Sequence, residues 1–174
     1  MTGAARPEFS RLIALARLGA EPFRQEIAAT EAESVALAQR FDLLALDRLC
    51  AVVELVRHRH DMVLLRAAFS AEFVQSCVVT LDPVGGALSE QFTLLYAPSE
   101  MEAEAGRTVE DEVAFEPLVG NAIDVGEAVA QQFALALPPF PRSPGATLDS
   151  ETPPADEAGP IAAALARLAG NQPR

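Results

Sequence analysis

Residues 75–84 have the sequence Gln75-Ser76-Cys77-Val78-Val79-Thr80-Leu81-Asp82-Pro83-Val84, and this stretch decides the fold. Its β-branched residues favour an extended backbone, whereas Pro83 lacks the amide donor that a central strand needs. Gly85-Gly86 follow directly and are typical of a turn. We therefore expect a strand that ends at Asp82-Pro83 and forms one arm of a central hairpin, with a second strand from Ala87 to Tyr96.

Short strand-like segments and one helix precede this stretch. We expect strands near residues 9–15, 22–28 and 48–57. Thr30-Glu31-Ala32-Glu33 is a capping box, because the hydroxyl and the carboxylate can each bond the other residue's amide, and it predicts a helix over 31–41. The run from Met62 to Cys77 is too long for one flat strand, so we expect a bend or bulge near Ser70-Ala71.

A second helix and a polar tail follow the hairpin. Asp124 with Glu127 three positions later predicts a helix start, and Pro138-Pro139 predict its end. Apolar residues recur between them at four-residue spacing: Val125, Val129, Phe133 and Leu137. Residues 160–174 contain a short Ala/Leu helix that either docks on the domain or folds on a partner.

These elements predict an α+β fold. We expect a curved antiparallel sheet or open β-barrel of about six strands, with two packed helices and a short C-terminal helix. One globular domain should cover residues 1–138 and carry an acidic loop at 97–117. A Pro-rich acidic linker at 139–159 and the helical tail at 160–174 complete the chain.

Charge is distributed unevenly along the chain. The net charge is −12, yet residues 1–66 contain nine arginines and nine acids, so the excess lies after residue 66, where sixteen acids face four arginines. An acidic surface repels a phosphate backbone, because nucleic-acid affinity depends on neutralising phosphates with cations. The charge favours a basic protein partner over autonomous binding of RNA or DNA.

Composition also bears on location. No apolar run approaches the ~20 residues of a membrane helix, and residues 1–8 lack the apolar core of a secretory signal. The two cysteines, Cys50 and Cys77, are too few for a disulfide scaffold. We expect a cytoplasmic protein with no membrane association and reduced cysteines.

Few residues point to chemistry. Cys77 could be a nucleophile or redox switch, but the only histidines, His58 and His60, lie together in an expected hairpin tip, so a buried structural cysteine is the better interpretation. Two histidines without a third ligand make a weak metal site. Gly85-Gly86 lack the Lys-Ser/Thr of a phosphate loop. We expect no enzyme, no cofactor and no metal.

Residues 75–84 resemble the YceD family, known as large ribosomal RNA subunit accumulation proteins. Ile123-Asp124-Val125-Gly126-Glu127, followed by Leu135-Ala136-Leu137-Pro138, is similar to that family's Ile-Asp-Leu-Gly-Glu signature and Leu-Ala-Leu ending. Residues 141–146 and 160–166 are similar more loosely. The chain departs from the pattern at Asp82, where Glu is common, and at Val125, where Leu is common.

The resemblance implies a non-enzymatic role in 23S rRNA accumulation and large-subunit assembly. Together with the charge, it favours binding of a basic ribosomal protein of the large subunit. The family-motif positions that could contact the partner are Cys77, Thr80, Leu81, Asp82, Pro83, Asp124, Gly126 and Glu127. The alternatives are direct rRNA binding through an arginine face made by Arg48, Arg57, Arg59 and Arg66, and a Cys77-dependent redox or enzymatic activity.

Overall fold

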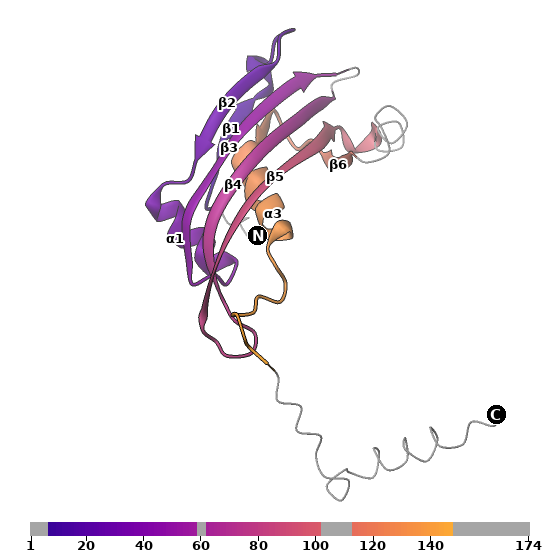
Figure 1. Ribbon diagram of the computed structural model, residues 1–174. Coiled ribbons are helices and arrows are strands. Elements are labelled where there is room, and N and C mark those ends of the chain that lie inside the picture. Colours follow the sequence, from indigo (N-terminus) through magenta and orange to yellow (C-terminus); the bar gives the residue numbers. More distant parts are fainter. Residues whose placement is uncertain (1–6, 59–61, 102–112, 148–174) are drawn as a thin grey trace, which may run out of the picture. The chain divides into compact units, whose positions relative to one another are not determined.

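The computed structural model describes residues 7–58, 62–101 and 113–147, and shows a curved sheet with helices packed on it (Figure 1). In chain order the elements are β1 (Leu12–Ala14), the 3-10 turn η1 (Leu15–Arg17), β2 (Phe23–Ala28), α1 (Glu31–Arg40), β3 (Ala45–Arg57), β4 (Val63–Ser76), β5 (Pro83–Ala97), the 3-10 turn η2 (Ser99–Met101), β6 (Ala114–Pro117), β7 (Ala122–Asp124) and α3 (Val125–Ala136). The predicted α+β class is confirmed.

The main sheet has five strands in the order β2-β3-β4-β5-β6, and β1 pairs with β7 in a separate two-stranded sheet. All neighbours in the main sheet are antiparallel except β5 and β6, which run parallel. The sheet is therefore mixed rather than wholly antiparallel. It stays open, so the curved sheet, and not a closed barrel, is the architecture.

Side chains alternate between buried and more exposed along β3 and β4, because successive residues of a strand point to opposite faces. The ladder from β4 to β5 runs without a register shift from Val63 opposite Tyr96 to Ser76 opposite Pro83. The bulge predicted near Ser70-Ala71 is therefore wrong. A shift lies instead between Leu46 and Arg48 on β3, and the long ladder bends by coiling along its length.

Residues 77–82 connect β4 to β5 and are not the strand predicted there. Gly85 and Gly86, predicted as a turn, lie inside β5. A Cβ at Gly86 would stand 2.6 Å from the Phe73 ring, so this glycine leaves room for an aromatic side chain on the facing strand. Pro83 starts β5, a position where a strand tolerates a missing donor.

Both predicted helix starts are confirmed. The Thr30–Glu33 capping box is complete at the start of α1, and the Asp124 carboxylate accepts a hydrogen bond from the Glu127 amide at the start of α3. The sheet curves around α3 (Figure 1), and Phe133 from this helix is fully buried. Its ring contacts those of Phe41, Phe69 and Phe73. Burying such a side chain contributes about 1.5–3 kcal/mol, so α3 is held to the sheet.

Three further predictions meet the structure only in part. The acidic loop expected at 97–117 contains η2 and β6, and its residues 102–112 lie outside the described residues. β6 forms because Leu95 of β5 and Phe115, which faces it in the ladder, share a small second core. Most of the linker expected at 139–159 and the whole tail at 160–174 also lie outside the described residues.

Candidate interaction site at the β4–β5 turn

The turn between β4 and β5 is closed by its own backbone. The Cys77 amide donates to the Asp82 carbonyl at 2.8 Å, and the Leu81 amide donates to the Cys77 carbonyl at 3.0 Å. Leu81 has a φ of 64°, the left-handed region that a leucine rarely adopts. Strain of this kind costs about 1–3 kcal/mol and persists only where the surroundings impose it. The turn is therefore a rigid structure and not a slack connection.

Residues 138–143, which follow α3, pack against this turn, and we name them the strap. The Val78 amide donates to the Pro141 carbonyl at 2.9 Å, and the Gln75 side chain donates to the Pro138 carbonyl at 3.1 Å. The hydroxyls of Thr80 and Ser143 lie 3.2 Å apart. The start of the predicted linker thus belongs to the folded domain, at least as far as these contacts reach.

Cys77 lies at the centre of these contacts with its side chain fully buried. Its sulfur accepts hydrogen bonds from the amides of Val79, Thr80 and Ser143 and from the Ser143 hydroxyl, at 3.3–3.5 Å. The donors from Ser143 and Thr80 lower the pKa of the Cys77 thiol to about 6. A nucleophile needs access to its substrate, and this thiol has none. Its role in the structure is that of an internal acceptor.

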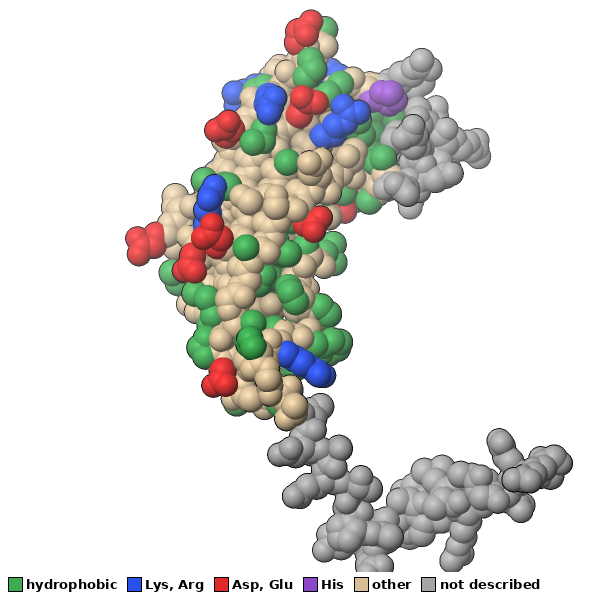
Figure 2. All heavy atoms as spheres, in the orientation of Figure 1, with side chains coloured by type: hydrophobic (Ala, Val, Ile, Leu, Met, Phe, Trp, Pro, Cys, Tyr) green, Lys and Arg blue, Asp and Glu red, His purple; other side chains and the backbone are tan. Residues whose placement is uncertain are grey.

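Exposed apolar side chains surround the turn. Leu81 is 76% exposed and Phe140, on the strap, is 75% exposed, while Val78 is 48% exposed. Figure 2 shows hydrophobic side chains gathering toward this end of the molecule, whereas charged side chains gather toward the other end of the same face. Exposed apolar residues grouped on a rigid loop are typical of a protein contact. We define Val78, Leu81 and Phe140 as the turn patch.

Three other predicted motif residues lie in or beside the turn. Thr80 contacts the strap and also accepts the Asp82 amide at 3.4 Å. Asp82 and Pro83 are exposed. The structure therefore brings five of the predicted positions together at one site: Cys77, Thr80, Leu81, Asp82 and Pro83.

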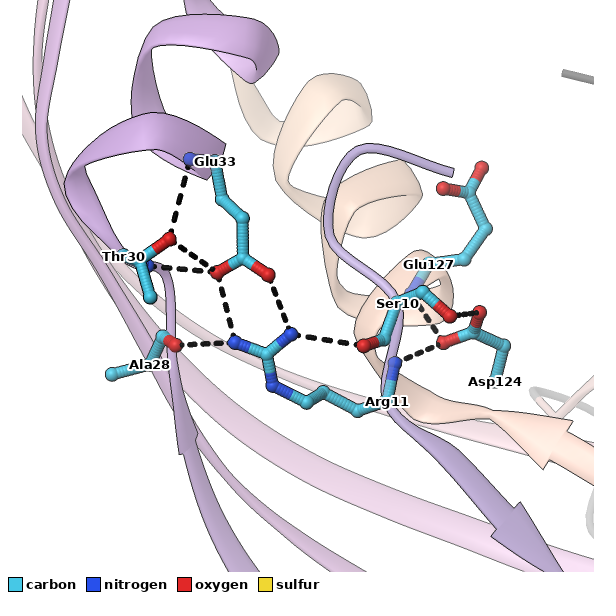
Figure 3. A network of polar contacts seen from close by, with 7 residues as sticks. All are labelled: Ser10, Arg11, Ala28, Thr30, Glu33, Asp124 and Glu127. Carbon is cyan, nitrogen blue, oxygen red and sulfur yellow. Dashed lines mark hydrogen bonds and ion pairs between the residues drawn. The ribbon is translucent and has the colours of Figure 1, made fainter. Parts of the chain in front are cut away.

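Asp124, Gly126 and Glu127 lie at a second place, the start of α3. Figure 3 shows Asp124 and Glu127 of this group. The Asp124 carboxylate accepts the Ser10 hydroxyl at 2.6 Å and the Arg11 amide at 2.7 Å, in addition to capping its helix. A Cβ at Gly126 would stand 2.4 Å from the Phe9 carbonyl oxygen. The motif thus lets the N-terminal segment approach α3 closely.

Two arginines join this motif to α1. Arg11 makes a two-pronged contact with Glu33 at 2.7 and 2.8 Å, which lowers the pKa of Glu33 to about 2 (Figure 3). Arg40 makes another with Glu127 at 2.8 and 2.7 Å, and the pKa of Glu127 is lowered by it. Two-pronged arginine contacts are strong and directional. The residues at the start of α3, together with Arg11 and Arg40, thus join the N-terminal segment, α1 and α3.

The predicted arginine face is only partly assembled. Arg48 and Arg66 lie on the sheet face away from α3, where they pair with Glu72 at 3.7 Å and Glu54 at 3.8 Å. Arg57 instead donates to the carbonyls of Leu18 and Leu15, the latter in η1. Arg59 lies outside the described residues. Arg24, which the sequence-based prediction omitted, faces Glu54 across the ladder.

Several contacts in these sites have no local sequence signal. Ser143 is 66 positions from Cys77, and Arg11 is 113 positions from Asp124. No spacing rule connects residues so far apart. The strained φ of Leu81 has none either, because a leucine gives no sign that it will adopt a conformation typical of glycine.

No group of three or more His, Cys, Asp or Glu residues within 7–58, 62–101 and 113–147 could hold a metal ion. His60, one of the two histidines weighed as ligands, lies outside those ranges. None of the described helices is long and apolar enough to cross a membrane.

Comparison with known proteins gives one match. Searches of curated proteins and of solved structures found none. The family model for the large ribosomal RNA subunit accumulation protein YceD matches residues 65–164, which is more than half of the chain. The matched region contains the β4–β5 turn, its strap and the start of α3. This chain belongs to the YceD family.

Proposed function

We propose that this chain supports accumulation of large-subunit rRNA as a non-enzymatic assembly factor of the bacterial cytoplasm, and that it acts by binding a basic ribosomal protein. The family description supports the rRNA role. The observation that carries the choice of partner is charge: sixteen acids against four arginines after residue 66. Such a surface attracts a basic protein and weakens contact with RNA itself.

The arginines of the N-terminal half support the same choice, because several are engaged within the protein. Arg11 and Arg40 bind carboxylates in two-pronged contacts, and Arg57 binds two carbonyls. An arginine that is held in this way is not available to neutralise a phosphate. Each ion pair also occupies a carboxylate, so the net charge stays at −12, but these guanidinium groups are engaged within the domain rather than displayed for phosphates.

The turn patch supports a protein partner in a second way. Charge complementarity accelerates association, but affinity in protein interfaces depends mainly on a few residues that become fully buried at the centre of the contact. Val78, Leu81 and Phe140 can serve as such anchors because their side chains are exposed on a rigid turn and strap. We therefore assign the partner's apolar contact to the turn patch.

A pull-down of the full chain at low and high salt tests the proposal. We expect a basic large-subunit ribosomal protein to co-purify at low salt and to be lost progressively as salt rises, since salt screens exposed charges. Leu81→Ser should reduce the recovered amount at every salt concentration. Val119→Ser is the matched control, because Val119 is also exposed, at 83%, and lies away from the turn in sequence. Absence of any ribosomal protein at low salt would refute the proposal.

Direct rRNA binding is the second candidate, and one observation favours it. Arg24 and Arg66 face Glu54 from its two sides in the ladder, and Arg48 lies on the same face of the sheet. Replacing Arg24, Arg48 and Arg66 with Ser should abolish crosslinking to rRNA if this face binds it. Unchanged crosslinking, or none in the parent protein, rules this candidate out.

A further inference from the structure

β5 is paired along almost its whole length on one side and only at its end on the other. Its ladder with β4 runs from Pro83 to Tyr96, whereas its ladder with β6 covers Leu94 to Ala97. No described residue forms a backbone hydrogen bond with the outer side of Pro83–Thr93. This segment, which we name the free edge, is about 35 Å long at the usual rise per residue.

The free edge has only one of the devices by which proteins usually block such edges. Those devices are lysines, inward-pointing charges, bulges, internal prolines and very short strands. Here the only proline is at the first position and the register is continuous. Glu90 is the only charged residue, and it lies on the core side of the sheet because it faces buried Phe69 in the ladder. Side chains at four positions are absent or small: Gly85, Gly86, Ala87 and Ser89. The backbone donors and acceptors are thus accessible.

Apolar surface lies beside the free edge as well. Leu88 and Phe92 are partly buried and pack against the core while remaining partly exposed. Where β6 begins, an open hollow of about 900 Å³ is lined in part by Phe92, Thr93, Ala114 and Gln132 and in part by the charged residues Arg24, Glu54 and Arg66 of the neighbouring strands. A strand added next to β5 would cover this surface with its inward side chains and reach toward the hollow with its end.

We propose that the free edge of β5 takes up an extended basic segment of a partner protein as an additional strand of the sheet. Strand addition derives its affinity from main-chain hydrogen bonds and its selectivity from alternate side chains. A basic segment fits because Glu90 has no ion pair with the other described residues and the chain carries a net charge of −12. That same charge disfavours a second copy of the chain as the occupant.

The proposal relies on the proposed function only for the identity of the partner. Strand addition can be tested apart from the proposed function with a defined probe, a fluorescent ten-residue peptide of alternating Arg and Val. Its two controls are the same peptide with every second amide N-methylated on one edge, and a Glu-Val peptide. N-methylation keeps the charge but removes the donors that strand addition requires, so it distinguishes strand addition from electrostatic attraction alone.

We expect the Arg-Val peptide to bind the full chain at low salt, with at least tenfold weaker binding for the N-methylated peptide and none for the Glu-Val peptide. Equal affinity for the first two peptides, or no binding by either, overturns the proposal. Concentration-dependent dimers in sedimentation, lost when the edge is blocked, would also overturn it by assigning the edge to a second copy.

Two proline variants test the edge on the protein side. Successive backbone N–H groups along a strand point to opposite sides. One of the two variants Ser89→Pro and Glu90→Pro therefore removes an N–H group on the free edge, and the other removes a hydrogen bond to β4. Melting identifies which variant keeps the fold, and that variant should bind the peptide at least tenfold more weakly. Gln91→Lys, compared with Gln39→Lys on the exposed surface of α1, gives the same test if both proline variants unfold.

The outcomes also separate this proposal from the proposed function. Recovery of a ribosomal protein by the parent chain and by the folded proline variant alike would leave the proposed function intact and refute strand addition. Edge-dependent binding of the Arg-Val peptide without recovery of any ribosomal protein would support strand addition and refute the proposed function.

Discussion

The amide of Ser143 donates a hydrogen bond to the sulfur of Cys77 at 3.3 Å, across 66 positions of sequence. Through this bond the strap after α3 holds the β4–β5 turn, and the turn presents Leu81 and Val78 to solvent. The buried Cys77 thiol therefore supports the exposed turn patch as a hydrogen-bond acceptor and not as a reactive group.

Removing the sulfur should weaken this arrangement. Cys77→Ala leaves the amides of Thr80 and Ser143 without their acceptor, and an unsatisfied buried donor costs about 1–3 kcal/mol. We expect a loss of that size in urea unfolding. Cys50→Ala, on the partly exposed sheet face, is the control and should cost less. Equal losses would show that Cys77 has no special role in the turn.

The two thiols should differ in reactivity because of access. Hydrogen bonds lower the pKa of both thiols, chiefly from Ser143 for Cys77 and from Ser70 for Cys50. Cys50 is partly exposed, whereas Cys77 is fully buried. We expect iodoacetamide to label Cys50 in the native protein and Cys77 only after unfolding, as measured by peptide mass spectrometry. Rapid native labelling of Cys77 would reopen the nucleophile interpretation.

Gly126 should not tolerate a side chain. A Cβ there would stand 2.4 Å from the Phe9 carbonyl and 2.9 Å from the Arg11 amide, so Gly126→Ala should destabilise the protein by about 1–3 kcal/mol despite alanine's better helix propensity. Gly85→Ala is the matched control, since nothing lies within 4 Å of its Cβ position. Thermal melting should show a clear loss for the first variant and little change or a gain for the second.

Stability should depend on pH through Glu33. Its pKa is about 2 because Arg11 holds the ionised form, against an ordinary value of 4.5. The unfolded chain therefore takes up the proton more readily than the folded chain, and stability falls as pH drops from about 4.5 toward 2. Above that window the contribution is complete. Glu33→Gln should be less stable than the parent at neutral pH, and the difference should shrink across the same window.

Glu31→Gln serves as the control for that titration, because Glu31 is an exposed acid in the same first turn of α1. Its urea midpoint should follow that of the parent across the pH range. A constant difference between Glu33→Gln and the parent from neutral pH to pH 2 would contradict the assignment.

Leu81 should show opposite effects on stability and binding. Leu81→Gly relieves the φ of 64° while losing little burial, so we expect unchanged or slightly higher stability, by up to about 1 kcal/mol. Recovery of the partner in the pull-down should fall, because the apolar anchor is gone. Asp42→Gly relieves a similar φ of 54° outside the turn patch and should leave recovery unchanged. Loss of stability with unchanged recovery would contradict the anchor role.

How far the sequence predicts this protein depends on the separation of the residues involved. Thr30 with Glu33, and Asp124 with Glu127, are three positions apart, so both helix starts follow from local chemistry. The stretch at 75–84 is where local reasoning fails. β-branched residues favour a strand there, but the sulfur of Cys77, the strap and the backbone bonds of the turn override that preference.

The sequence by itself determined the α+β class, the helix starts, the apolar stripe of α3, the acidic excess and the family motifs. These depend on composition and on interactions within a few residues. Tertiary structure alone decided the burial of Cys77 under Ser143, the approach of Phe9 to Gly126 and the parallel entry of β6 that leaves Pro83–Thr93 without a neighbour among the described strands. Each of these depends on which distant segments pair and in what register, and no local periodicity encodes that choice.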